Sequence, residues 1–266
     1  MMSTNVKKWA MAGILSLSVF SLVACGSNQG SENKPAKTQD QALTVVTNAE
    51  FPPFESQEGG KIVGFDVDLI NAVAKAENLQ VKVQHTPWDA MFDAIDHDKA
   101  NVAIAAITVN DERKQKYDFS DSYFEAKQFI LVPKDSTVAK LDDLKGKKIG
   151  VQTATTGEKV LQDRFGKTYE GIKGFDDIPA AIDDLTTKRL DAVVVDKAVV
   201  LEYVKKIGSQ KFKIVDDSSI QPEYYGILVK KGNSELLSKI NDGLKKIKQD
   251  GTYDQISKKY FADQAK

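Results

Sequence analysis

An arginine and a threonine near the middle of the chain have the chemistry of a carboxylate-binding pair. Arg113 lies in the run Asp111-Glu112-Arg113-Lys114, shortly after Thr108. A planar guanidinium can hold a carboxylate through two parallel bonds, and the Thr108 hydroxyl with backbone N–H groups near it can fill the remaining lone pairs. By composition alone, however, such a charge run is more typical of a solvated helix start.

A second group of candidates could bind a positively charged group of a ligand, or could help Arg113 bind its carboxylate. Asp196 ends an apolar run and can accept from an ammonium group, while the same position suits the N-cap of a helix that starts at Lys197. The two roles are compatible. Thr155 and Thr156 precede another predicted helix, whose free N–H groups attract a carboxylate. An N-cap explains one of these threonines, but less readily both.

All of these candidates need a scaffold that gathers strand ends. Short β-rich runs alternate with helical stretches, which is typical of mostly parallel sheets covered by helices on both faces, with ligands at the carboxyl ends of the strands. Asp66 and Asp89 are predicted N-caps of two helices. The predicted strands are residues 43–47, 81–84, 102–106, 148–152 and 192–195, and two later predicted helices are residues 177–187 and 197–206.

The composition argues against several classes of function. Residues 42–266 exceed the commonest size of one domain, and 41% of the chain is hydrophobic, so a substantial core is available. The net charge of −1, with both signs interspersed, offers no footprint for nucleic acid. His85 and His97 match no nucleophile or metal spacing, and no glycine-rich phosphate loop is present, so we expect no metal, no cofactor and no enzymatic activity.

The N-terminal residues predict export and lipid attachment. Lys7 and Lys8 precede an apolar stretch, and residues 22–25 end in Cys25, the single cysteine of the chain. This arrangement resembles the lipobox of bacterial lipoproteins, so residues 1–24 are predicted to be a signal peptide and Cys25 the lipidation site. Residues 25–41, the lipidated cysteine and the polar stretch after it, are predicted to form a flexible tether. The alternative is an uncleaved anchor, although a spanning helix wants ~20 apolar residues and this run is shorter.

Three segments together resemble the polar amino-acid-binding proteins of bacterial ABC importers. They are residues 48–55 followed by 64–68, residues 105–108 with 111–113, and residues 191–196. The resemblance runs from about residue 43 to residue 261. It implies an extracytoplasmic, monomeric receptor. The receptor traps an amino acid as its lobes close and presents the closed form to a membrane permease.

The fold that this resemblance implies is α/β and two-lobed, of the type II periplasmic-binding-protein-like class. Each lobe is a mostly parallel sheet flanked by helices, and two hinge strands join the lobes. One lobe comprises residues 42–123 and 225–266, and the other comprises residues 128–220. The hinge strands are expected near residues 123–127 and 221–225.

The resemblance also assigns roles to the candidate residues. A free amino acid is a zwitterion, and burying it requires pairing both main-chain charges. Arg113 with Thr108 is expected to hold the α-carboxylate, Asp196 the α-ammonium, and the rings of Phe51 and Trp88 are expected to sandwich the ligand side chain. The implied ligand-binding residues are Asn48, Glu50, Phe51, Trp88, Ala105, Ala106, Thr108, Arg113, Gln152, Thr155, Thr156 and Asp196.

The polar positions favour a basic ligand, with arginine first. Several relatives carry aspartate at the position of Asn48, and Glu50 can replace that carboxylate, although it could equally face solvent. Gln152 lacks the charge of the lysine that some glutamine binders have, and Val195 replaces a polar residue found in some. The alternatives are a binder of glutamine or cystine, a dehydratase-like enzyme with Glu50 as its base, and an extracytoplasmic sensor domain, which the lack of a spanning segment after Phe261 disfavours.

Overall fold

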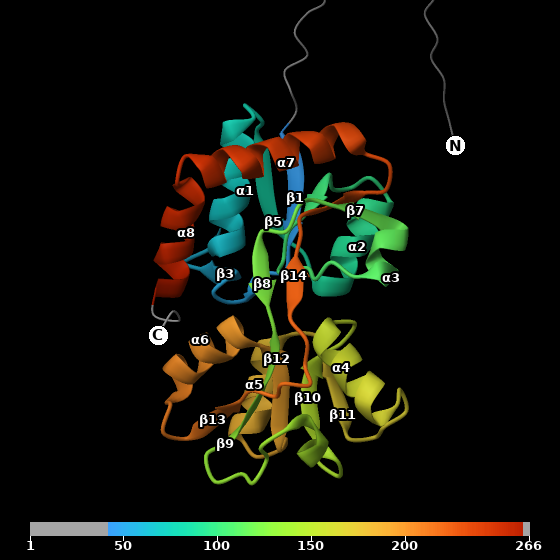
Figure 1. Cartoon of the computed structure of the whole chain (residues 1–266), viewed down its shortest axis with the longest axis vertical. Coiled ribbons are helices and arrows are strands. Elements are labelled where there is room, and N and C mark those ends of the chain that lie inside the picture. Colours follow the sequence, from blue (N-terminus) through green and yellow to red (C-terminus); the bar gives the residue numbers. More distant parts are fainter. Residues whose placement is uncertain (1–41, 263–266) are drawn as a thin grey trace, which may run out of the picture. The chain divides into compact units, whose positions relative to one another are not determined.

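Two five-stranded sheets, built from different parts of the chain, carry the fold (Figure 1). The computed structural model describes residues 42–262, so the predicted signal peptide, Cys25 and the tether lie outside the described residues. The first sheet has the order β5 (Val81–His85), β1 (Leu43–Thr47), β6 (Val102–Ala103), β15 (Leu228–Lys230) and β7 (Tyr117–Phe119). The second has the order β11 (Ile172–Phe175), β10 (Ile149–Gln152), β12 (Ala192–Asp196), β9 (Gln128–Pro133) and β13 (Phe212–Val215).

Each sheet is mostly parallel with one reversed strand. β1 pairs in parallel with β5 and β6, and β15 then pairs antiparallel with β6 and β7. In the second sheet β10 pairs in parallel with β11 and β12, and β9 pairs antiparallel with β12 and β13. The reversed strands β9 and β15 are the ones that follow the connections between the sheets, so they enter from the opposite end. The predicted α/β architecture is confirmed.

Two short strands connect the sheets. β8 (Phe124–Ala126) and β14 (Glu223–Tyr225) pair antiparallel, and both run between the two sheets (Figure 1). The rings of Phe124 and Tyr225 stack with centroids 5.6 Å apart, which adds a packing contact to the short ladder. A third, three-stranded sheet consists of β2 (Glu50–Phe51), β3 (Glu55–Glu58) and β4 (Lys61–Val63).

Helices cover both faces of the first sheet because its side chains alternate. Val45 and Val102 lie in one buried cluster with Leu69 of α1 (Phe65–Ala76). Their neighbours Val46 and Ala103 face the other way and pack with α2 (Trp88–Asp96). Alternation of this kind follows from the two-residue period of an extended strand. The helices that complete this lobe are α3 (Asp111–Lys116), α7 (Ser234–Gln249) and α8 (Thr252–Phe261), of which α7 and α8 pack on α1.

The second sheet repeats this arrangement. Val193 packs in the cluster that contains Ala181 of α5 (Ile178–Thr186), and Val194 packs in the cluster that contains Leu161 of α4 (Thr156–Phe165). α6 (Lys197–Ile207) and the short 3-10 helix η1 (Leu141–Leu144) complete this lobe. No helix within residues 42–262 combines the length and the apolar character that crossing a membrane requires.

The predicted caps at Asp66 and Asp89 are wrong. α1 has Gly64 as its N-cap, and α2 has Pro87, so each aspartate lies inside the first helical turn. Gly64 has φ 138°, and a Cβ there would overlap the carbonyl oxygen of Phe54. The close approach of the β2–β3 turn therefore selects glycine as the cap and turns Asp66 inward, where it is fully buried.

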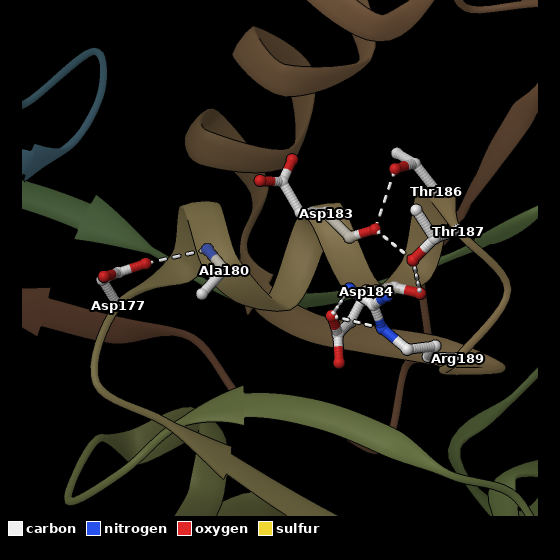
Figure 2. A network of polar contacts seen from close by, with 7 residues as sticks. All are labelled: Asp177, Ala180, Asp183, Asp184, Thr186, Thr187 and Arg189. Carbon is white, nitrogen blue, oxygen red and sulfur yellow. Dashed lines mark hydrogen bonds and ion pairs between the residues drawn. The ribbon is translucent and has the colours of Figure 1, made fainter.

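α5 has local polar contacts at both ends (Figure 2). Asp177 caps its N-terminus by accepting from the backbone N–H of Ala180 at 2.8 Å. At the other end the hydroxyls of Thr186 and Thr187 donate to the carbonyl of Asp183 at 2.9 and 2.8 Å. These contacts fix the helix whose first residue, Ile178, reaches the cavity described below.

Candidate functional site

A cavity lies where the carboxyl ends of β1, β6, β10 and β12 meet. Its position agrees with the rule that open α/β sheets bind ligands at these strand ends. All of the predicted ligand-binding residues except Glu50 line it. The lining residues are Asn48, Phe51, Glu55, Trp88, Ala105, Ala106, Thr108, Arg113, Gln128, Gln152, Thr155, Thr156, Ile178, Val194, Val195 and Asp196.

Arg113 points into the cavity, whereas its neighbours in the charge run are exposed. Asn110 caps α3 by accepting from the Arg113 backbone N–H at 2.9 Å, which sets the start of the helix. The guanidinium donates to the carbonyl of Thr108 at 2.9 Å and lies 5.4 Å from the ring centroid of Trp88. Burial lowers the pKa of Arg113 to about 10, which leaves it charged at neutral pH. The charged residues 111–114 thus form a solvated helix start, from which the Arg113 side chain alone enters the cavity.

Asp196 supplies the opposite charge. It is buried at the end of β12, where Gln128 donates to one carboxylate oxygen at 2.9 Å and the Tyr225 hydroxyl donates to the other. Burial, with a further contribution from the nearby Glu223, raises the pKa of Asp196 to about 7. Asp196 occupies the N-cap position of α6, yet its side chain makes no capping hydrogen bond. Its carboxylate therefore faces the cavity and does not cap the helix.

The two predicted threonines have different roles. Thr155 is the N-cap of α4, and its hydroxyl accepts from the N–H of Glu158 and donates to the carbonyl of Gln152. The Thr156 hydroxyl instead lies 3.3 Å from the hydroxyl of Thr108, which belongs to the other lobe. Thr108 also donates to Glu223 of β14 at 2.7 Å.

Several hydrogen bonds join the lobes across the cavity. Gln152 donates to the Asn48 side chain at 3.1 Å, and Trp88 donates from its indole nitrogen to the carbonyl of Ala154 at 3.3 Å. Arg113 reaches the same carbonyl at 3.4 Å. Together with the contact between Thr108 and Thr156, these bonds connect the two lobes across the cavity.

Glu50 does not line the cavity. It lies in β2 with its backbone paired to Ser56, and its carboxylate accepts from the Asn48 side chain at 3.1 Å. Adjacent residues of an extended strand point to opposite sides, and here Phe51 takes the side that faces the cavity. Glu50 thus acts on the lining through Asn48.

Glu55 is the main residue that the sequence did not indicate. It is opposite Phe51 in the β2–β3 ladder, is fully buried, and lines the cavity. Among the described residues no donor serves either of its carboxylate oxygens. Burial, followed by the charge of Asp66, raises the pKa of Glu55 well above its usual value. The polar stretch of β3 carries no apolar pattern, so no sequence signal distinguished Glu55 from a loop residue. Gln128 and Ile178 were also missed, because each begins an apolar element, β9 or α5, whose pattern predicts burial in the core and not exposure to a cavity.

Asp66 supports the cavity wall. One of its oxygens accepts from the Ala106 backbone N–H at 2.8 Å and from the Tyr123 hydroxyl at 2.8 Å. Ala106 has φ 48°, a left-handed conformation that an alanine seldom adopts without such a partner. The segment after β6, which supplies Ala105 and Ala106 to the lining, is therefore fixed by a buried carboxylate on α1.

The lining suits a small ligand that carries both charges. Arg113 provides a fork of donors on one side, and the buried carboxyl groups of Asp196 and Glu55 provide acceptors elsewhere. Phe51 and Trp88 add flat apolar surface. Within residues 42–262 no group of three or more histidine, cysteine, aspartate or glutamate side chains is placed to hold a metal ion.

Comparison with known proteins gives a consistent result. The profile of the bacterial extracellular solute-binding proteins, family 3, matches residues 43–263. A protein of Neisseria gonorrhoeae named "Probable histidine-binding protein" is 41% identical over 97% of both chains.

Two solved structures extend the comparison. The arginine-, lysine-, histidine-binding protein ArtJ of Geobacillus stearothermophilus superposes with a TM-score of 0.81 at 45% identity, covering 84% of this chain and 96% of its own. An ancestral arginine-binding protein bound to glutamine superposes with a TM-score of 0.77 at 44% identity, covering 83% and 97%. The predicted two-lobed fold is confirmed by these likenesses.

Proposed function

Because the chain belongs to the bacterial extracellular solute-binding proteins of family 3, we propose that it captures a basic L-amino acid and delivers it to the permease of an ABC importer. The observation that carries this proposal is one cavity that combines an inward arginine with buried carboxyl groups and aromatic rings. The names of the Neisseria gonorrhoeae protein and of ArtJ, which refer to histidine, arginine and lysine, support a cationic ligand.

The main-chain charges of the amino acid have partners in this proposal. The α-carboxylate is held by the Arg113 fork, with help from the hydroxyls of Thr108 and Thr156. The α-ammonium pairs with Asp196, whose carboxylate is already oriented by Gln128. Pairing both charges is required, since an unpaired buried charge costs several kcal/mol.

The side chain of the ligand determines the specificity. We place it between Phe51 and Trp88, with its charged end toward Glu55 in preference to Glu50. Glu55 lines the cavity with two unsatisfied oxygens, whereas Glu50 already accepts from Asn48. Stacking a cation on the rings contributes roughly 0.5–2 kcal/mol, and a charged acceptor adds pairing that a neutral ligand cannot use.

Titration calorimetry tests the assignment. The ligand-free protein is titrated with arginine, lysine, histidine, ornithine, glutamine and cystine, and we expect arginine to bind most tightly. Glu55→Gln should weaken arginine more than glutamine, and Glu50→Gln, the matched control, should have the smaller effect. If glutamine or cystine binds as tightly as arginine, the basic ligand is wrong, while the solute-binding function survives.

Closure of the lobes is the proposed signal to the permease. Ligand should shift an open form toward the closed arrangement held by the bonds between Gln152 and Asn48 and between Trp88 and Ala154. The radius of gyration from solution scattering should therefore fall when arginine is added. Gln152→Ala should reduce this fall at a given arginine concentration, and an unchanged radius in the wild-type protein would contradict closure. In this proposal one moving lobe comprises residues 42–123 with 225–266, and the other comprises residues 128–220.

The cellular location is proposed from the N-terminal sequence. We infer that residues 1–24 are removed, that Cys25 is acylated, and that the mature monomer is held at the outer side of the cell membrane. Cells grown with a fatty-acid probe should label the wild-type protein, and Cys25→Ser should abolish both labelling and processing. Membrane association without label would favour an uncleaved apolar anchor.

An enzymatic function is the second candidate, because a buried carboxyl with a raised pKa, such as Glu55, could serve as an acid or base. We propose that Glu55 recognises charge and does not catalyse. A product assay on cyclic acid substrates decides this point, since any turnover that Glu55→Gln removes would establish the dehydratase-like alternative.

A further inference from the structure

Two buried carboxyl groups meet at the edge of the cavity. Glu55 of β3 and Asp66 of α1 are both fully buried, and the backbone N–H of Asp66 donates to the carbonyl of Phe54, the residue before Glu55, at 2.9 Å. One Asp66 oxygen accepts from the Ala106 N–H and the Tyr123 hydroxyl. No described donor serves the other Asp66 oxygen or either oxygen of Glu55. The unsatisfied oxygens are therefore the ones through which the two groups can face each other.

A shared proton resolves this geometry. Two carboxylates in one buried site cannot both ionise at moderate cost, and a protonated carboxyl can donate to its neighbour. The two donors on Asp66 stabilise its charged form, whereas Glu55 has none, so the proton belongs on Glu55. Burial raises the pKa of both groups, that of Asp66 to about 7 and that of Glu55 well above its usual value.

The other ionisable groups around the pair do not supply a counter-charge. Asp196 of β12 adds negative charge, and the hydroxyls of Tyr123 and of Tyr253 on α8 are neutral at physiological pH. Arg113 is the cation that lines the same cavity, but its guanidinium is bound to the carbonyls of Thr108 and Ala154. A positive charge for Glu55 must therefore come from the ligand.

We propose that the Glu55–Asp66 pair is the charge-selective element of the site, in which Glu55 exchanges its proton for the cationic side chain of the ligand. The O–H bond of Glu55 breaks, the proton passes to solvent, and the carboxylate pairs with the arriving guanidinium or ammonium. A neutral side chain leaves the proton in place. This inference rests on the proposed function, since it requires that a basic amino acid binds.

The exchange makes selectivity depend on pH. At pH values below the pKa of Glu55, the affinity for arginine should increase up to tenfold for each unit by which the pH is raised, because one proton is released for each ligand bound. The affinity for citrulline, the neutral isostere of arginine, should lack this contribution. Asp196 can also release a proton to meet the α-ammonium, but arginine and citrulline share that group. The difference between the two ligands therefore isolates Glu55.

Calorimetry at pH 7 in phosphate, HEPES and Tris measures the number of protons released, because the observed enthalpy varies with the ionisation enthalpy of the buffer. We expect arginine to release up to one proton more than citrulline. Glu55→Gln should remove the excess and weaken arginine. Asp66→Asn should also remove the excess while arginine still binds, since the amide can accept from Ala106 and Tyr123 and donate to an ionised Glu55.

The outcomes separate the two proposals. If arginine produces neither heat nor a thermal shift in any buffer, the proposed function fails and the exchange fails with it. If arginine binds and releases the same number of protons as citrulline, only the exchange is overturned. Should citrulline fail to bind, the comparison passes to arginine with wild-type and Glu55→Gln protein, where equal proton counts overturn the exchange. Circular dichroism checks that each variant is folded.

Discussion

Replacing Arg113 by alanine should weaken every amino-acid ligand by a similar factor. The guanidinium is desolvated, as its lowered pKa of about 10 reflects, and it is held by the carbonyls of Thr108 and Ala154 and by the face of Trp88. Truncating one partner of a buried ion pair costs ~3–5 kcal/mol. Since ~1.4 kcal/mol corresponds to a tenfold change in Kd, we expect binding to weaken roughly 140- to 3,700-fold.

The effect should not discriminate among ligands, because the α-carboxylate is common to all of them. Calorimetry with arginine, lysine, histidine and glutamine measures it, with competition titrations for the weak complexes. Arg113→Lys should give an intermediate loss, since it keeps the charge but not the planar fork. Lys114→Ala, an exposed neighbour in the same charge run, is the matched control and should leave affinity unchanged. Unaltered affinity in folded Arg113→Ala protein, or losses that differ more than tenfold between ligands, would refute this role of Arg113.

Three further predictions concern stability. Gly64→Ala should destabilise the protein by at least ~2 kcal/mol more than Gly146→Ala, because Gly146 also has a positive φ but has open space around it. Urea unfolding compares the two variants. Similar losses would contradict the argument that a Cβ at Gly64 overlaps the carbonyl oxygen of Phe54. Burial and Glu223 raise the pKa of Asp196 to about 7 in the folded state, above its unfolded value, so the folded state binds more protons. The contribution of Asp196 to the unfolding free energy should therefore decrease as the pH rises from about 4 to about 7. Asp196→Asn should lessen that fall in thermal unfolding of the ligand-free protein, and an unchanged slope would argue against the raised pKa. Asp177→Ala should cost ~1 kcal/mol through the lost cap of α5, and no loss in urea unfolding would show that the cap is dispensable.

The alternation of strand and helix patterns in the sequence was enough to predict most of the strands. β1 begins and ends as predicted, and β5, β10 and β12 differ from the prediction by one residue at one end. The predicted strand at residues 102–106 contracts to β6, since the chain turns at Ala106 to meet Asp66. Local propensity and burial period determine where a strand lies, but a contact between distant segments can end it early.

The sequence could indicate Asp196 through its place at the end of a predicted strand, and Arg113, Phe51 and Trp88 through the resemblance to a known family. It could not distinguish Glu50 from Glu55, since both lie in short polar segments without a burial pattern. Only the pairing of β2 with β3 decided that Glu55 shares the cavity with Phe51 while Glu50 supports Asn48. Likewise, Asp66 is a residue type that often caps a helix. Because close packing selects Gly64 as the cap of α1, Asp66 lies in the first turn and is a buried neighbour of Glu55. Residue type sets which charges a site can use, whereas the protonation of those charges depends on burial and on neighbours that only the folded chain brings together.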